Sequence, residues 1–122
     1  LIGTYNYPLS PDENLKDAEY AGSLTMEYRQ FCPEDHCWIR FLVDTKDSLE
    51  QELLLVAHFQ NPSGNYYYRT FDIAGSNTAF EKWLITPHVR SESDSLKTYF
   101  WNRSNADVKI TRARLMVYAP AS

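Results

Sequence analysis

Residues 96–102 (LKTYFWN) and 108–118 (VKITRARLMVY) are the two segments that decide the fold class of this 122-residue chain. The first alternates large and polar side chains with a period of two, as a β-strand with one buried face does. The second is rich in β-branched and apolar residues, and a short polar break separates the two. The pattern predicts two strands joined by a short turn, which is a β-hairpin at the end of the chain.

The second of these segments changes phase in its middle. Val108 and Ile110 share one face of a strand, whereas the apolar positions from Ala113 onward fit one face only if a residue is inserted. A β-bulge at Thr111 and Arg112 would insert that residue. We therefore expect the final strand to bend there, at the rim of a sheet.

Working back from this hairpin, strand patterns recur at intervals of about ten residues. An apolar run at 53–59 predicts a central strand, a turn is expected at 61–65, and Pro87 favours an edge position for the strand around it. Residues 38–43 are expected to be the hairpin partner of the strand before them. The expected strands cover residues 24–31, 38–43, 53–59, 66–73, 83–89, 96–102 and 108–118, with an edge strand near Tyr5 and Tyr7 and one helical turn within 14–20. Eight short strands predict an all-β sandwich or barrel.

The composition limits the function classes. Nine Tyr, six Phe and three Trp favour strands. A net charge of −4 without a basic stripe argues against a nucleic-acid partner, and no apolar run reaches the roughly 20 residues of a membrane span. A length of 122 residues predicts one domain, 1–122, with an N-terminal arm at 1–20. Because the chain begins at Leu1 rather than Met, we expect it to be cut from a longer protein, which would provide any membrane contact.

Cys32 and Cys37 lie at the two ends of a short loop that is expected to be a hairpin turn. Residues that face each other at the base of such a turn lie about 5.5 Å apart, which suits a disulfide. A disulfide and two free thiols both stay open, and a disulfide would imply an oxidising compartment. A zinc site made of these two cysteines and His36 would need a further ligand, which the sequence does not offer.

The C-terminal third resembles the end of galactose-binding-domain-like and carbohydrate-binding-module-like jelly rolls of bacterial envelope and secreted proteins. The resemblance rests on WLITP at 83–87, LKTYFWN at 96–102 and VKITRARLMVY at 108–118. It implies a jelly-roll-like antiparallel β-sandwich, an extracytoplasmic location (periplasm, cell surface or secreted) and an accessory role. Thr111 and Arg112 stand where such domains carry two acidic residues, which lowers the expectation of a metal ion there.

Sugar binding is the leading hypothesis for the function. Sugar rings present flat apolar faces rimmed by hydroxyls, so a site needs an exposed aromatic platform beside polar groups. Neighbouring strand residues point in opposite directions, so Tyr67 cannot share a face with Tyr66 and Tyr68. Trp83 and Trp101 are expected to pack in the core and not on a ligand. The candidate ligand-binding residues are Asn65, Tyr66, Tyr68, Arg69, Asn102 and Arg103.

Three other functions are alternatives to sugar binding. Hydrolysis lacks a nucleophile-elbow or zinc-protease motif around His36, His58 or His88, so no enzyme activity is expected. No cofactor is expected either, although a structural calcium ion could use acidic residues of the arm, namely Asp12, Glu13, Asp17 and Glu19. The alternative to a glycan is a protein surface, which would make the chain an interaction or structural domain of a membrane-anchored parent.

Overall fold

The computed structural model of the chain describes residues 1–10, 13–16, 18–33, 35–46, 51–73, 78–87 and 93–120, without the side chains of Asn65 and Tyr66. These residues form eight β-strands and one helical turn. In chain order the elements are β1 (Gly3–Asn6), β2 (Tyr20–Glu27), α1 (Tyr28–Phe31), β3 (Trp38–Thr45), β4 (Leu54–Asn61), β5 (Gly64–Asp72), β6 (Ala79–Ile85), β7 (Ser95–Trp101) and β8 (Ile110–Tyr118).

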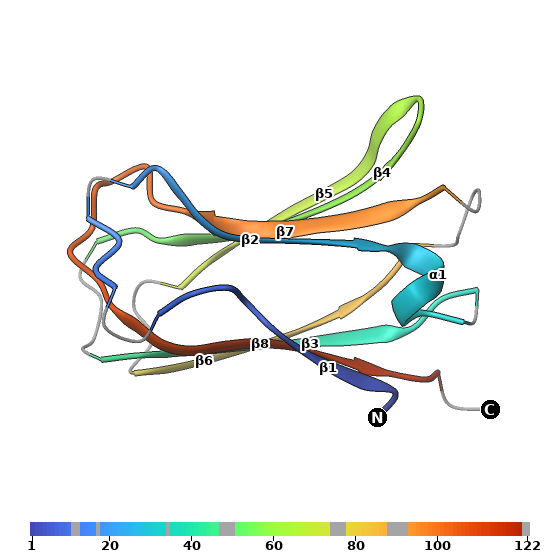
Figure 1. The fold of residues 1–122 in the computed structure, drawn as a ribbon, viewed down its shortest axis with the longest axis horizontal. Helices are drawn as coiled ribbons and strands as arrows, with labels where there is room; N and C mark the ends of the chain where they lie inside the picture. Colours follow the sequence, from blue (N-terminus) through green and yellow to red (C-terminus); the bar gives the residue numbers. More distant parts are fainter. Residues whose placement is uncertain are drawn as a thin grey trace.

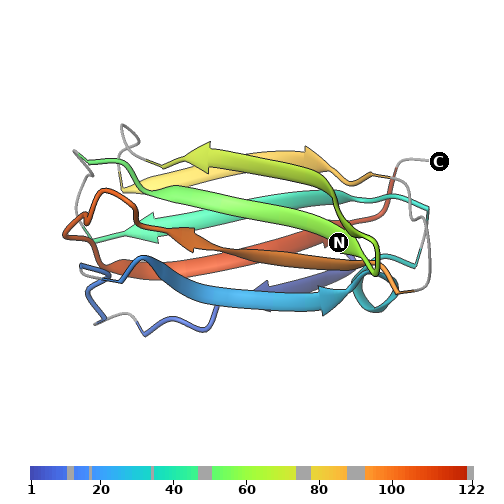
Figure 2. The ribbon, with the colours of Figure 1, turned by 90° about the horizontal axis from the view of Figure 1, so that it is seen from above.

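The strands form two antiparallel four-stranded sheets that pack face to face as a sandwich (Figure 1). One sheet has the order β1-β8-β3-β6 and the other has the order β2-β7-β4-β5. Seen from above, the strands of the two layers run roughly along one axis (Figure 2), as in aligned sandwiches. Successive strands alternate between the sheets except at β4 and β5, which is the connectivity of a jelly roll. The predicted fold class is confirmed.

Two predicted hairpins are wrong. β7 pairs with β2 and β4, whereas β8 pairs with β1 and β3 in the opposite sheet. Likewise, β2 and β3 lie in different sheets and do not pair. The reason is that alternation along a strand shows which face is buried but not which strand lies beside it. Each connection therefore crosses from one sheet to the other where the sequence pattern predicted a tight turn.

The strand positions predicted at the sheet edges and centre are confirmed. β1 and β6 are edge strands, and β4 lies between β7 and β5. The bulge in β8 is also present: Asp44 of β3 pairs with Arg112 and Thr45 pairs with Ile110, which leaves Thr111 as the inserted residue.

The helical turn expected within residues 14–20 is wrong for the part of that segment that the structure describes. Asn14 forms a β-bridge with Lys109, and the Leu15 N–H donates to the Val108 carbonyl over 2.8 Å. A helical turn forms instead at α1, inside the segment expected to continue β2. Its first and last residues, Tyr28 and Phe31, are both buried, and their ring centroids lie 5.1 Å apart. Residues three apart lie on one side of a helical turn, so both rings reach the core.

The core lies between the two sheets and is made of alternate residues of each strand. Leu96, Thr98 and Phe100 of β7 point inward, and Ile39 and Phe41 of β3 are buried in the same core from the opposite sheet. Thr98 is a polar residue in this layer, and its Oγ1 lies 2.8 Å from the Tyr7 hydroxyl. Burial raises the pKa of Tyr7, so the phenol stays protonated and the hydrogen bond stays neutral. This bond ties the N-terminal arm to the centre of the opposite sheet.

Tyr7→Phe should lower the free energy of unfolding by about 1–3 kcal/mol, because it leaves the buried Thr98 hydroxyl without its partner. Thr98→Val should lower the free energy of unfolding by a similar amount, because it leaves the buried Tyr7 hydroxyl without this partner. The double variant should cost clearly less than the sum, because neither polar group then remains. Urea unfolding of the three variants measures this coupling, and additive losses would contradict it.

Cys32 and Cys37 are present as free thiols, and both are fully buried. They lie at the end of α1 and just before β3. The hydrogen bond to Cys32 and burial raise the pKa of the Cys37 thiol, whereas Thr86 lowers it in part. The Thr86 Oγ1 accepts the backbone N–H of Cys37 over 2.9 Å. A raised pKa keeps the thiol protonated, and the protonated form is the unreactive one.

We expect a thiol reagent at pH 8 to react with native protein far more slowly than with denatured protein, because both thiols are buried and the thiolate is disfavoured. In protein that is denatured without a reducing agent, two thiols per chain should react with the reagent. Fewer than two equivalents would show that the alternative left open by the sequence, a disulfide, forms in solution. Cys32→Ser serves as the control, with one equivalent expected.

No helix among the described residues combines the length and the apolar character needed to cross a membrane.

Candidate functional site

The outer face of the β2-β7-β4-β5 sheet carries a cluster of aromatic side chains. On β7, the residues between the inward positions point outward, which places Tyr99 and Trp101 on this face. Tyr20 of β2 lies opposite Trp101, and His58 of β4 lies opposite Tyr68 of β5. Four neighbouring strands thus bring residues from distant parts of the chain together. We call Tyr20, His58, Tyr68, Tyr99 and Trp101 the aromatic face.

Contacts between these side chains hold the aromatic face in one arrangement. The ring of Tyr20 stacks on Trp101 with centroids 6.0 Å apart and meets Tyr99 edge-on at 5.6 Å. His58 Nε2 lies 2.8 Å from the Tyr99 hydroxyl. The ring of His58 also meets Tyr68 edge-on at 4.5 Å. The side chains are therefore positioned before any ligand arrives, which lowers the entropic cost of binding.

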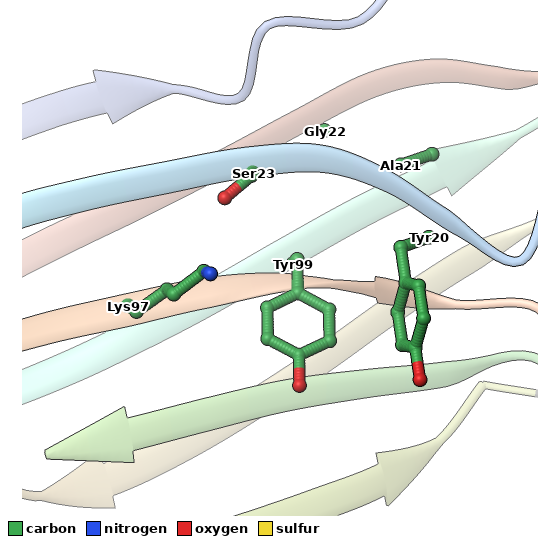
Figure 3. Close-up of a pocket in the computed structure, with 6 residues that line it drawn as sticks. All are labelled: Tyr20, Ala21, Gly22, Ser23, Lys97 and Tyr99. Atoms are coloured by element: carbon green, nitrogen blue, oxygen red, sulfur yellow. The ribbon is translucent and has the colours of Figure 1, made fainter. Parts of the chain in front are cut away.

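Beside the aromatic face, a pocket of about 380 Å³ opens to solvent. A β-bulge in β2 shapes one wall, because the pairing with β7 shifts register between Ala21 and Leu24. Gly22 in this bulge has a φ of 65°, a conformation that favours glycine. Figure 3 shows the rings of Tyr20 and Tyr99 side by side, with both hydroxyls pointing the same way. The pocket is lined by Tyr20, Ala21, Gly22, Ser23, Lys97 and Tyr99.

Gly22→Ala should lower the free energy of unfolding by at least about 1–2 kcal/mol, the cost of a left-handed conformation for a residue with a Cβ. The added Cβ would also lie 2.9 Å from Cγ of Leu9, so the Leu9 side chain must shift. Thermal or urea unfolding measures the loss, and Ser23→Ala, an exposed neighbour, is the control. Unchanged stability of Gly22→Ala would show that the bulge tolerates a side chain.

The phenols of Tyr20 and Tyr99 on the aromatic face are protonated at neutral pH. Burial raises the pKa of Tyr99, and the nearby Tyr68 and Tyr20 raise it further. Partial burial raises the pKa of Tyr20, and the neighbouring Glu19 raises it further. Protonated phenols both donate and accept hydrogen bonds. The face therefore combines flat apolar rings with hydroxyls suited to a polar ligand.

Arg103 flanks the aromatic face at the end of β7. Its guanidinium lies 5.1 Å from the centroid of the Trp101 ring and forms an ion pair with Glu52. The second contact of that pair, from Nη2 to Oε2, is 3.0 Å long. The hydrogen bond from Arg103 lowers the pKa of Glu52. The charge of this arginine is therefore already matched by a carboxylate.

The sequence-predicted ligand residues fall in different places. Tyr68 lies on the aromatic face and is 43% exposed. Arg69 points to the other side of β5, where its guanidinium lies 4.1 Å above the Tyr67 ring and donates to the Tyr68 carbonyl over 2.8 Å. The prediction that Tyr67 and Tyr68 point to opposite faces of the strand is thus confirmed. The candidate side chains of Asn65 and Tyr66 lie outside what the structure describes.

Asn102 is unavailable to a ligand, because it is buried and its amide is used inside the protein. Its Nδ2 donates to the carbonyls of Leu15 at 2.9 Å and Ala106 at 3.0 Å, and its Oδ1 accepts the Ala106 N–H at 2.8 Å. These bonds shape the connection that leaves β7 for the opposite sheet. The candidate role of Asn102 in sugar binding is therefore corrected to a structural one.

The expectation that Trp83 and Trp101 pack in the core is wrong. Leu96, Thr98 and Phe100 take the inward positions of β7, so Trp101 points away from the core. Trp83 is 43% exposed on the outer face of the other sheet. The alternation of β7 could have revealed the position of Trp101. Tyr20 and His58, by contrast, join the site through strand pairing, which no local pattern in the sequence predicts.

The outer face of the β1-β8-β3-β6 sheet carries a second apolar group. Trp38 pairs with Ile85 on one side and with Tyr118 on the other. The ring of Trp83 lies 5.0 Å from that of Tyr118, and Arg40 lies 5.5 Å from the Trp83 centroid. Arg40 is paired with Glu81. We call Trp38, Trp83, Ile85 and Tyr118 the opposite face.

Among the described residues, no group of three or more His, Cys, Asp or Glu side chains could hold a metal ion. Two of the acidic residues considered for calcium, Asp12 and Asp17, lie outside the described residues. The other two, Glu13 and Glu19, are exposed. His88, considered for hydrolysis, also lies outside them.

The sequence matches no protein-family model, and no curated protein is significantly similar to it.

Proposed function

We propose that this chain is a non-catalytic domain that binds glycans on the aromatic face. The observation that carries the proposal is the adjacent placement of Tyr20, Tyr99 and Trp101 on β2 and β7, beside an open pocket. Tyr20 is 57% exposed, so its ring is available to a ligand. A sugar ring can lie its apolar C–H face on such rings while the phenols and Ser23 bond its hydroxyls.

The form of the sheet supports this use of the face. The β4–β5 hairpin bends away from the opposite sheet at its tip (Figure 1). Its strands contribute His58 and Tyr68, which extend the aromatic face beyond the pocket. A chain of several sugar units would contact the pocket with one unit and the rings of His58 and Tyr68 with another. Contacts spread over several units are how a shallow site gains affinity.

The residues that line the pocket support a binding role over hydrolysis. Glycoside hydrolysis requires two carboxyl groups on either side of the scissile bond. The lining consists of aromatic, small and hydroxyl residues with one lysine, and it contains no carboxylate. The nearby Glu19 acts on the pKa of Tyr20 but is not part of the lining. The arrangement is suited to holding a sugar and has no acid and base pair to cleave it.

The proposed setting of the domain follows from the resemblance of its C-terminal third to galactose-binding-like and carbohydrate-binding-module-like jelly rolls. We propose that it is an accessory part of a longer bacterial envelope or secreted protein, located outside the cytoplasm. The jelly-roll connectivity is compatible with this family, although one fold carries many functions.

Tyr20→Ala and Tyr68→Ala should each weaken binding to a recognised polysaccharide by at least about tenfold, which corresponds to about 1.4 kcal/mol. Both side chains are exposed, so their loss should leave the fold intact. A glycan array identifies the ligand, and affinity electrophoresis or calorimetry measures the change. Trp83→Ala on the opposite face is the matched control and should bind like the original chain. Absence of binding to every glycan would overturn the proposal.

The second candidate function is a protein-interaction domain that uses the opposite face. It is favoured by the exposure of Trp38, Trp83 and Ile85, which form part of a contiguous apolar group on adjacent strands. Exposed apolar patches of this kind often mark protein interfaces. The same variants separate the two functions, because this alternative requires Trp83→Ala to weaken association and Tyr20→Ala to leave it unchanged.

A further inference from the structure

The pocket beside the aromatic face carries one charge. Of the six residues that line it, Lys97 alone is charged. Its Nζ lies 5.8 Å from the centroid of the Tyr99 ring. Within the described part of the chain, Lys97 forms no ion pair, whereas Arg40 and Arg103 are each matched by a glutamate. The pocket therefore has a positive charge that no carboxylate of its own wall neutralises.

The two ends of the pocket differ in sign. Figure 3 shows Lys97 on one side of Tyr99 and Tyr20 on the other. At the Tyr20 end, the exposed Glu19 precedes Tyr20 in the chain and places a carboxylate near its ring. A carboxylate there accepts hydrogen bonds from sugar hydroxyls and repels an anionic group. A ligand with one negative group would therefore place it at the Lys97 end.

We infer that the pocket selects a sugar unit that carries an anionic group, a carboxylate or a sulfate, and holds that group at Lys97. This inference rests on the proposed function and names its ligand class. The sugar ring lies against Tyr99, the anionic group bonds the lysine ammonium, and the remaining hydroxyls bond Ser23 and the acidic end. The lysine ammonium is a compact charge with rotatable donors, so it can donate hydrogen bonds to a carboxylate or to a sulfate.

Because the whole chain is negatively charged, a preference for anionic sugars must come from contacts within the pocket. The net charge of −4 does not attract polyanions at long range. Discrimination therefore depends on contact between the anionic group and Lys97 and not on general attraction. Neutralising a lysine elsewhere should leave the preference unchanged, and this provides a matched control.

The experiment uses pairs of polysaccharides that differ only in charge. One arm compares uronate-containing polysaccharides with their carboxyl-reduced forms, and the other compares sulfated polysaccharides with their desulfated forms. The full chain should bind the anionic member of a pair about tenfold more tightly, as expected for a hydrogen bond to a charged group. The arm that shows the preference identifies the anionic group. Raising the salt concentration should reduce the preference.

Lys97→Gln should remove the preference while retaining binding to the neutral member, and Lys97→Arg should keep it. Lys46→Gln makes the same change in net charge at an exposed position after β3 and should leave the preference intact. Equal binding of both members, or a preference that survives in Lys97→Gln, would overturn the inference and leave the proposed function standing. Failure to bind any member of any pair would overturn both.

Discussion

The alternation of side chains along β7 is the constraint on which the rest of the structure depends. Leu96, Thr98 and Phe100 fill the space between the sheets, so the residues between them must point outward. Those outward residues include Lys97 and Tyr99, which line the pocket. A slip of one residue in the pairing of β7 would bury the charged and phenolic groups and expose the core. The packing of the interior thus determines the geometry of the candidate site, and Tyr7 reinforces it through Thr98.

The two outer faces of the sandwich differ in their chemistry although both carry aromatic residues. On the aromatic face, the Tyr99 hydroxyl lies beside His58, and phenols and Lys97 line an open pocket. On the opposite face, Trp83 lies against Tyr118, and the nearby Arg40 is already paired with Glu81. Sugars need rings together with unsatisfied polar groups, whereas a protein surface can cover apolar area alone. This difference is the reason that we propose glycan binding for the first face and not for the second.

The sequence predicts where the strands lie better than it predicts which strands pair with each other. Alternation and turn residues locate β4, the turn that follows it and the bulge at Thr111 because these depend on nearby residues. The pairing of β7 with β2 and β4 depends on the entire arrangement, and here the hairpin prediction fails. The site shares this limit. Tyr68 is predictable as an exposed strand tyrosine, whereas Tyr20 joins Trp101 only because two strands far apart in the chain lie side by side.

The connectivity of the sandwich also determines when the pocket can form during folding. Only β4 and β5 pair as neighbours in the sequence; every other pairing of the described strands joins distant segments. Such topologies fold slowly, because long loops must close before their contacts form. The pocket needs β2 and β7, and β7 is held through its core face by residues of the opposite sheet. A partly synthesised chain that lacks β7 cannot contain the pocket, so the pocket exists only after the last strands have been made and have paired.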